Sequence, residues 1–276
     1  MEAVISSVPS PTVPAVSHTH TSSLGSSPAH RHTRGETVLE LVPAVESHQS
    51  STESAEAEDV QPRLRSEQAS RVLNVVVAGV ALVTLSPVLL AVAILVRLTS
   101  RGPILYAQTR VGVDRRFGKD TTYDRRAYDH GGKPFRIYKF RTMRVDAEAD
   151  GRPVWATKAD ARVTPIGGFL RRSRIDELPQ LYNVIRGDMN IVGPRPERPA
   201  IFAELRRNIP EYHMRQRVRP GITGWAQINQ AYDACVDDVR RKVRYDLEYL
   251  RRQGMLEDLR IMSMTIPVMI FRKGGW

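Results

Sequence analysis

The stretch VLNVVVAGVALVTLSPVLLAVAILVRL, residues 72–98, decides the fold because it is the longest apolar run in the chain. It carries no charge before Arg97, and a helix of this length can cross a bilayer of about 30 Å. Pro87 lacks a backbone donor and clashes with the preceding turn, while the hydroxyl of Ser86 can satisfy a carbonyl that Pro87 leaves free. The sequence therefore predicts one long apolar helix with a bend near its middle.

Charges at the two ends of this stretch leave its membrane topology open. Arginines flank both ends, namely Arg63, Arg65 and Arg71 before it and Arg97, Arg101 and Arg110 after it. Because the distribution lacks asymmetry, the positive-inside rule does not assign the ends to opposite sides of a membrane. A straight spanning helix is one interpretation. The other is a helix that breaks at Ser86-Pro87 and returns to the cytoplasmic face.

Residues 1–65 differ in composition from the rest of the chain. They are rich in Ser, Thr, Pro, Glu and Ala, and we expect a disordered tail that is dispensable for chemistry. The net charge of +11 divides into about −4 for this tail and about +15 for the remainder. Such a basic remainder calls for an anionic partner: phospholipid, nucleic acid or nucleotide sugar. No secretory signal is expected, and the single Cys235 suits a reducing compartment.

Short patterned segments after residue 101 predict strands and helices. Residues 104–112 and 133–143 are β-branched and aromatic runs that can pair as a hairpin across a charged link at 114–132. Helical spacing predicts four helices, over Ile166–Arg174, Leu178–Ile185, Pro199–Arg207 and Val236–Arg252. The last apolar run, from Leu259, is too short to span a bilayer and either lies in the membrane interface or packs as core.

The segment SRIDELPQLYNVIRGDMNIVGPRPERP, residues 173–199, places Asp176 and Glu177 among many arginines. In one interpretation Asp176 caps the following helix and Glu177 forms exposed ion pairs. In the other the arginines bind phosphates. Adjacent helical residues point about 100° apart, so one carboxylate can attack phosphorus while the other helps to hold Mg²⁺. Histidine catalysis is disfavoured, because only His130 and His213 lie outside the tail.

The order of these motifs resembles that of the monotopic phosphoglycosyl transferases, also called bacterial sugar transferases. The likeness covers residues 66–276 and rests on Ser-Pro in the apolar helix, YKFRTM at 138–143, RRSRIDELPQLYNVIRGDMNIVGPRPERP at 171–199 and VRPGITGWAQIN at 218–229. It implies that a sugar phosphate moves from a UDP-sugar to undecaprenyl phosphate, which starts an exopolysaccharide, a capsule or a glycoconjugate. It also implies that Ser86-Pro87 breaks a re-entrant helix.

The resemblance assigns roles to particular residues. Asp176 is implied to be the nucleophile, which forms a phosphosugar–enzyme intermediate with loss of UMP. Glu177 is implied to assist with Mg²⁺, and both acids are candidate ligands of that ion. The positions carried over as phosphate or nucleotide contacts are Lys139, Arg141, Arg171, Arg195 and Arg219.

Together these observations predict an α-rich α+β fold in three parts. We expect a tail over 1–65, a re-entrant membrane helix region over 66–101, and a small cytoplasmic catalytic domain over 102–276 with a short β-hairpin and amphipathic interfacial helices. The expected location is the bacterial inner membrane, with the catalytic domain facing the cytoplasm. Membrane lipid is a further expected partner, nucleic acid is not expected, and a homo-oligomer is left open.

Some positions depart from the family pattern, and one other class of function remains. Asn74 stands where many members have Asp, and Asn229 is followed by Gln230 and Ala231 instead of Gly-Arg, so the sugar is not identified. The alternative is a membrane-tethered nucleic-acid-binding protein without catalysis, which predicts tight, salt-sensitive binding to DNA or RNA. The paired acids beside the arginines count against it.

Overall fold

The computed structural model describes residues 59–114, 131–147, 160–230 and 236–271, with residues 270 and 271 described by their backbone alone. Residues 1–58, most of the 114–132 link, His130 and Cys235 lie outside the described residues, so the predictions made for them stay predictions. The order of elements is α1 (Glu67–Thr99), β1 (Leu105–Val111), β2 (Pro134–Phe140), α2 (Pro165–Arg172), η1 (Ile175–Glu177), α3 (Gln180–Arg186), β3 (Asn190–Val192), α4 (Pro199–Asn208), η2 (Pro210–Arg217), β4 (Gly221–Thr223), α5 (Trp225–Asn229), α6 (Val236–Arg252) and α7 (Met255–Phe271).

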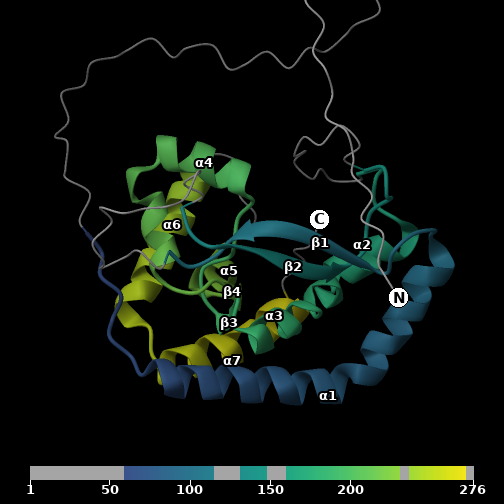
Figure 1. Ribbon diagram of the computed structural model, residues 1–276, viewed down its shortest axis with the longest axis horizontal. Coiled ribbons are helices and arrows are strands. Elements are labelled where there is room, and N and C mark those ends of the chain that lie inside the picture. The colour runs from purple at the N-terminus through teal and green to yellow at the C-terminus, as the bar shows by residue number, and fades with distance from the viewer. Residues whose placement is uncertain (1–58, 115–130, 148–159, 231–235, 272–276) are drawn as a thin grey trace, which may run out of the picture. The chain divides into compact units, whose positions relative to one another are not determined.

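Helix α1 is a single long helix that changes direction along its length (Figure 1). Pro87 lies inside it, and Ser86 Oγ donates to the carbonyl oxygen of Val83 at 2.8 Å, which is the carbonyl that a residue at 87 would otherwise bond. This confirms the compensating role predicted for Ser86. The helix is long and apolar enough to cross a membrane by length and composition, and little of its most apolar window is buried against the rest of the protein.

Both halves of α1 pack on the rest of the chain. The first half contacts α3, β3 and α7. There the fully buried Asn74 donates to the carbonyl of Ser70 at 2.7 Å and accepts from the amide of Ile191 at 2.5 Å, so its amide anchors α1 to β3. The second half contributes Val92 and Val96 to a small core with Phe140 of β2 and Leu170 of α2.

The predicted hairpin is confirmed. Strands β1 and β2 pair antiparallel, with a register that runs from Leu105 opposite Phe140 to Val111 opposite Pro134. The free edge of β2 is closed by a side chain of α3, because Asn183 Nδ2 donates to the carbonyl of Arg136 and Asn183 Oδ1 accepts from the amide of Tyr138. The hairpin is therefore fixed to α3, the helix that directly follows the acid pair.

A second, parallel pairing joins two sequence motifs that the sequence alone does not connect. Asn190 of β3 lies opposite Gly221 of β4, and the amide of Gly193 donates to the carbonyl of Thr223 at 2.9 Å. A Cβ on Gly221 would lie 2.1 Å from the Gly193 nitrogen, so the close approach of these segments requires glycine. This contact brings the GPRP segment beside the RPGITG segment.

The helix-rich composition with a small sheet agrees with the predicted fold class, and the helices follow the predicted ranges closely. Helix α6 has the predicted bounds. Helix α7 combines the two interpretations given for the last apolar run, because Ile261 is fully buried in the main core whereas Leu256 and Ile266 are largely exposed.

Residues 59–65, which the sequence analysis places in the tail, pack on the rest of the protein. Val60 is buried, and its carbonyl accepts from Arg217 Nη1 at 2.6 Å. The amide of Arg63 donates to the carbonyl of Leu250 at 2.9 Å. Arg65 forms an ion pair with the buried Asp258 of α7 at 3.1 Å. The packed part of the chain thus begins before residue 66.

Candidate active site

A left-handed residue positions the acid pair. Arg174 has a φ of 58°, and among the described residues it is the one non-glycine residue with a positive φ. It ends the turn after α2 and starts the single 3₁₀ turn η1, which carries Asp176 and Glu177. Backbone conformations of this kind cost free energy and concentrate at functional sites. The local strain therefore lies directly beside the two candidate carboxylates.

Glu177 is buried and surrounded by cations. Lys139 Nζ of β2 donates to Glu177 Oε1 at 2.9 Å. Arg195, which follows β3, donates from Nη1 to Oε2 at 3.0 Å and from Nη2 to Oε1. Arg174 Nη1 lies 3.8 Å from Oε1. Both oxygens of Glu177 are thus engaged, and the exposed pairing expected in the capping interpretation is wrong.

Asp176 is equally buried but is engaged differently. It is 7% exposed, and its Oδ1 is buried without a hydrogen-bond partner in the described part of the chain. Helix α3 has Pro179 at its N-cap and no side-chain cap bond, so the interpretation of Asp176 as a helix cap is wrong. A buried carboxylate oxygen without a partner costs free energy. Asp176 therefore has bonding capacity that the fold does not use.

Burial and the neighbouring charges shift the pKa values of the two acids in opposite directions. Burial, and then the neighbouring charge of Glu177, raise the pKa of Asp176 to about 6, against the opposing effect of Lys139 and Arg195. Burial would also raise the pKa of Glu177, but Arg195, Lys139 and Arg174 outweigh it and hold that pKa well below its usual range. The surrounding charges thus favour the ionised form of Glu177, whereas burial favours the protonated form of Asp176 up to about pH 6.

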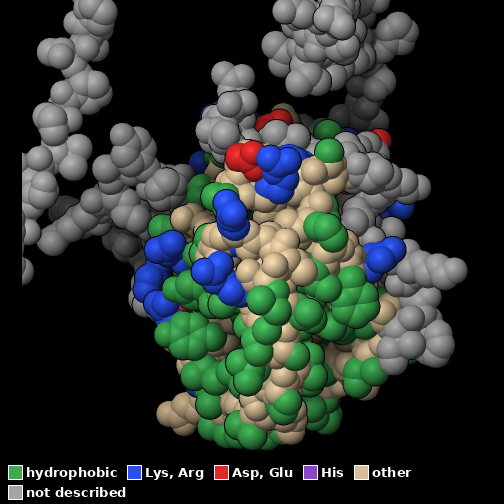
Figure 2. All heavy atoms as spheres, turned by 90° about the vertical axis from the view of Figure 1, so that its right-hand side faces the viewer, with side chains coloured by type: hydrophobic (Ala, Val, Ile, Leu, Met, Phe, Trp, Pro, Cys, Tyr) green, Lys and Arg blue, Asp and Glu red, His purple; other side chains and the backbone are tan. Residues whose placement is uncertain are grey.

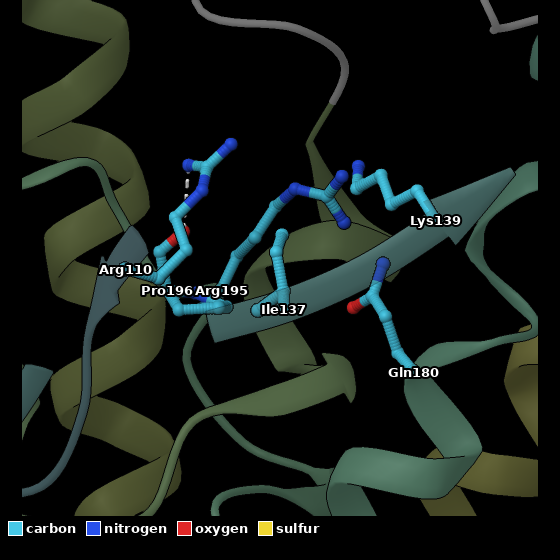
Figure 3. Close-up of a pocket in the computed structure, with 6 residues that line it drawn as sticks. All are labelled: Arg110, Ile137, Lys139, Gln180, Arg195 and Pro196. Carbon is cyan, nitrogen blue, oxygen red and sulfur yellow. Dashed lines mark hydrogen bonds between the residues drawn. The ribbon is translucent and has the colours of Figure 1, made fainter. Parts of the chain in front are cut away.

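A small hollow is lined by two of the cations that contact Glu177, and two other polar residues that line it were not predicted as site residues. Figure 3 shows Arg110 and Gln180 together with Lys139 and Arg195 around this hollow, which Ile137 and Pro196 complete. Arg110 Nη1 donates to the carbonyl of Pro196 at 3.0 Å. The position of Gln180, one turn after Asp176 and directly after Pro179, was the one sequence signal that could have found it.

The structure brings Lys139 and Arg195 to the acid pair and places the other three predicted contacts in different surroundings. Arg141 is buried and donates to Ser100 and to the carbonyl of Pro103, at the end of α1. Arg171 lies in the last turn of α2, near Asp160. Arg219 Nη1 lies 2.7 Å from Glu67 Oε2 and lines a separate hollow of about 400 Å³ beside residues 61–65.

Comparison with known proteins identifies the family. Residues 65–272 match the sequence profile of the family described as Bacterial sugar transferase. The chain belongs to this family. Membership of a family of transferase enzymes agrees with the resemblance found in the sequence, and it gives no support to the nucleic-acid-binding alternative.

Three relatives illustrate the likeness. The UDP-N-acetylgalactosamine-undecaprenyl-phosphate N-acetylgalactosaminephosphotransferase of Aeromonas hydrophila is 39% identical over 72% of this chain and 43% of its own length. The UDP-glucose:undecaprenyl-phosphate glucose-1-phosphate transferase of Escherichia coli strain K12 is 40% identical over 71% and 39%. A protein of the same name from Caulobacter vibrioides is 38% identical over 76% and 72%. The chain thus spans about two fifths of the length of the first two.

A second set of buried charges fixes the backbone of the candidate site at Arg195. Arg215 and Asp246 are fully buried, with Arg215 Nε donating to Asp246 Oδ2 at 2.6 Å. Arg215 also donates to the Tyr212 hydroxyl and, at 3.1 Å, to the carbonyl oxygen of Arg195. The last contact fixes the backbone from which Arg195 reaches Glu177. These buried charges act on the site through the position of Arg195.

The acid pair is compatible with a magnesium ion bound through few protein ligands. Within the described residues no three His, Cys, Asp or Glu side chains form a cluster. Mg²⁺ commonly takes one or two carboxylates, substrate phosphates and waters. Asp176 Oδ1 is an open oxygen of this kind, whereas the oxygens of Glu177 already accept from Lys139 and Arg195. The donor set fits an ion that arrives with a substrate phosphate.

Proposed function

We propose that this protein transfers a sugar 1-phosphate from a UDP-sugar to undecaprenyl phosphate through a covalent intermediate on Asp176. The observation that carries the proposal is the buried Asp176 Oδ1 without a partner, next to a glutamate whose charge Lys139 and Arg195 balance. The names of the relatives in Aeromonas hydrophila and Escherichia coli supply the substrate class. The product would start an exopolysaccharide, a capsule or a glycoconjugate.

The reaction divides into two displacements at phosphorus. In the first, a carboxylate oxygen of Asp176 forms a bond to the phosphorus that bears the sugar, the bond between this phosphorus and the bridging oxygen breaks, and UMP leaves with the bonding electrons. In the second, a phosphate oxygen of undecaprenyl phosphate attacks the same phosphorus and displaces the Asp176 carboxylate. The lipid then carries a sugar diphosphate, and the enzyme returns to its starting form.

The cations around the pair suit this chemistry. Lys139 and Arg195 can stabilise the charge that develops on the phosphoryl oxygens, because they are held in place before the substrate arrives. We propose that Asp176 and Glu177 hold Mg²⁺ together with the substrate phosphates. When bound, the ion would offset the charge of the pyrophosphate and of the departing UMP.

We also propose that α1 enters the membrane and returns on the cytoplasmic side. Near its start, Arg71 donates to the carbonyls of Val184 and Ile185 in α3, and beyond its end Arg141, which directly follows β2, donates to the carbonyl of Ser100. Both ends are thus tied to the same catalytic body, which supports a return path, because a straight span would place them on opposite sides of the membrane. On the face seen in Figure 2, hydrophobic side chains gather below and Lys and Arg side chains lie above them, as expected of a membrane interface.

Mass spectrometry tests the proposed function directly. Purified protein with Mg²⁺ and UDP-glucose or UDP-N-acetylgalactosamine, without lipid, should release UMP and gain the mass of one phosphosugar on the peptide that contains Asp176. Added undecaprenyl phosphate should remove this mass. Release of UMP only when the lipid is present, with no adduct, would favour direct attack by the lipid phosphate.

Labelling tests the topology. Single cysteines at the exposed positions Gln68 and Arg101, in a variant that lacks Cys235, should both react from the cytoplasmic side alone. Reaction of one of them from the outer side would establish a spanning helix instead.

A further inference from the structure

We propose that Gln180 contacts the substrate, with its side-chain amide donating a hydrogen bond to an oxygen of the phosphoryl group that is transferred. This inference rests on the proposed function and adds a donor that neither the sequence motifs nor the comparisons assign. Gln180 is 2% exposed, and its Nε2 is buried without a hydrogen-bond partner in the described part of the chain. A buried donor that is left unsatisfied loses the hydrogen bonds it makes to water in the unfolded chain, and this loss destabilises the fold. Packing alone therefore gives no reason for an amide at this position.

The open amide lies where a phosphoryl group would be held. Gln180 is the first residue of α3, four residues after Asp176, and it lines the hollow with Lys139 and Arg195. In Figure 3 its amide nitrogen points up from α3 to the same side as the ends of these two cations. Lys139 and Arg195 also pair with Glu177, so the hollow with the open donor of Gln180 shares two cations with the acid pair, in which Asp176 has the open oxygen. One phosphoryl group could satisfy both the donor and this oxygen, with phosphorus facing the carboxylate and an oxygen accepting from the amide.

The hollow has the size for this contact. Its volume is about 10 Å³, room for a group the size of one water molecule. A phosphoryl oxygen fits such a space, whereas a uridine or a sugar ring does not and would lie outside it. The hollow is therefore suited to binding the reacting phosphoryl group, and it does not select between different sugars.

Asn183, on the same helix, is a side-chain amide with a structural role and contrasts with Gln180. Asn183 is fully buried, and both ends of its side chain bond to β2, at Arg136 and Tyr138. Among the described residues Asn190 Nδ2 is also buried without a partner, but Asn190 does not line the hollow. Gln180 is thus the one side-chain amide of the described residues with an open donor that lines the hollow. Arg110 Nε is also unpartnered there, but Arg110 is anchored through Nη1 to the carbonyl of Pro196 and through Nη2 to Gln108.

A neutral donor suits this position for an electrostatic reason. Lys139 and Arg195 already supply positive charge, and each further cation would draw Asp176 into an ion pair and reduce its reactivity towards phosphorus. An amide adds a directed hydrogen bond without adding charge. Such a bond can strengthen as negative charge grows on the phosphoryl oxygens in the transition state, which is the condition for raising kcat.

Two substitutions and one control test the inference. Gln180→Met keeps the length of the side chain and removes the donor, Gln180→Glu keeps the shape and replaces the donor with an acceptor, and Asn183→Leu removes a satisfied amide. UMP release is measured with UDP-glucose and UDP-N-acetylgalactosamine, with and without lipid, beside the Tm of each variant. We expect Gln180→Met to lose about 10²- to 10³-fold in kcat with little change in KM. Its Tm should equal or exceed that of the wild type.

The outcomes separate the inference from the proposed function. We expect Gln180→Glu to be at least as slow as Gln180→Met, and Asn183→Leu to lose Tm first and activity only in proportion. A wild type that releases UMP together with a Gln180→Met variant of equal kcat would overturn the inference alone. So would a Gln180→Met variant whose activity falls only as far as its Tm does. A wild type that releases no UMP with any UDP-sugar would overturn the proposed function and this inference with it.

Discussion

Two buried groups of charges contact Arg195, one through its backbone carbonyl and the other through its guanidinium. They differ in whether each carboxylate oxygen has a hydrogen-bond partner. Behind it, Arg215 and Asp246 are 0% and 2% exposed and bond to each other, and Arg215 also bonds to a hydroxyl and a carbonyl. In front of it, Glu177 is satisfied by Lys139 and Arg195 in much the same way. The front group, however, also contains Asp176, whose Oδ1 has no partner among the described residues.

The oxygen without a partner distinguishes a reactive group of charges from one that only stabilises the fold. A buried ion pair with satisfied hydrogen bonds resists change, since removing one member leaves an uncompensated charge. A buried acid with an open oxygen destabilises the fold when it is ionised, and a ligand or a reaction can use that oxygen. The acids are buried in both groups. The feature that marks the site is the atom without a partner.

The largest expected effect of a substitution in the front group is that of Asp176→Asn. It removes the anionic nucleophile, so UMP release and the phosphosugar adduct should fall to background. It should also stabilise the fold at pH 8, because a rise of the Asp176 pKa from 3.8 to about 6 corresponds to a cost of about 3 kcal/mol for ionised Asp176. The folded state binds this proton more tightly than the unfolded state, so the cost is present above pH 6 and is lost as pH falls through 6 towards 4. Near wild-type turnover by this variant would refute the nucleophile assignment.

Glu177→Gln should act on the rate and on its pH dependence together. In the wild type the first half-reaction should slow about tenfold per pH unit below about pH 6, as Asp176 gains its proton. The substitution removes a negative neighbour and leaves Lys139 and Arg195 free to favour ionised Asp176, so the acid limb should move to lower pH. We expect the rate at high pH to fall by about 10²- to 10⁴-fold, with weaker use of Mg²⁺. An acid limb that stays at pH 6 would show that a group other than Asp176 controls it.

The same change of Asp to Asn behind Arg195 should have the opposite effect on stability. Asp246→Asn leaves the buried Arg215 without a compensating charge and should cost about 3–5 kcal/mol of folding free energy, measured as a lower Tm in detergent at both pH 5 and pH 8. Replacing both members, with Arg215→Met and Asp246→Leu, should recover much of this loss. A Tm that rises in Asp246→Asn as it does in Asp176→Asn would remove the distinction between the two groups.

The sequence predicted the parts of this fold that repeat a pattern over several residues. The hairpin strands and α6 follow alternating or helical apolar spacing, and the acid pair is visible as two acids among arginines. The parallel pairing of β3 with β4 was not predicted, because strands of three residues are too short to show a period. Arg141, which was predicted to contact phosphate, donates to the carbonyl and hydroxyl of Ser100 and to the carbonyl of Pro103, and a sequence pattern does not reveal these contacts.

The left-handed turn at Arg174 escaped prediction for a similar reason. Positive φ is signalled by glycine or asparagine, and the segment contains neither at this position. Gln180 escaped because a hydrogen bond that is absent from the folded chain is visible only once the surrounding atoms are placed. The sequence therefore identified the charged residues of the site more readily than the geometry that makes one of them reactive.

A third buried group of charges lies where the described chain begins, and its substitution should change the stability less than Asp246→Asn does. Asp258 of α7 accepts from the Tyr249 hydroxyl at 2.7 Å and pairs with Arg65 at 3.1 Å, but burial outweighs both and raises its pKa. Arg65→Met leaves the carboxylate with the Tyr249 hydroxyl as its side-chain donor in the described part of the chain, and should cost about 1–3 kcal/mol at pH 8. Because the substitution raises the folded pKa of Asp258 further, the loss should shrink as pH falls through that pKa and the carboxyl takes up a proton.

Arg63→Met, at an exposed position two residues earlier, is the matched control and should change Tm little. Tm in detergent at pH 5 and pH 8 measures both variants. An equal and small effect of the two would mean that residues 59–65 contribute no more to the fold than a solvated tail does. A loss confined to Arg65→Met, and larger at pH 8 than at pH 5, would place this segment in the folded domain. It would also rank the Arg65–Asp258 pair between the satisfied pair behind Arg195 and the open acid in front of it.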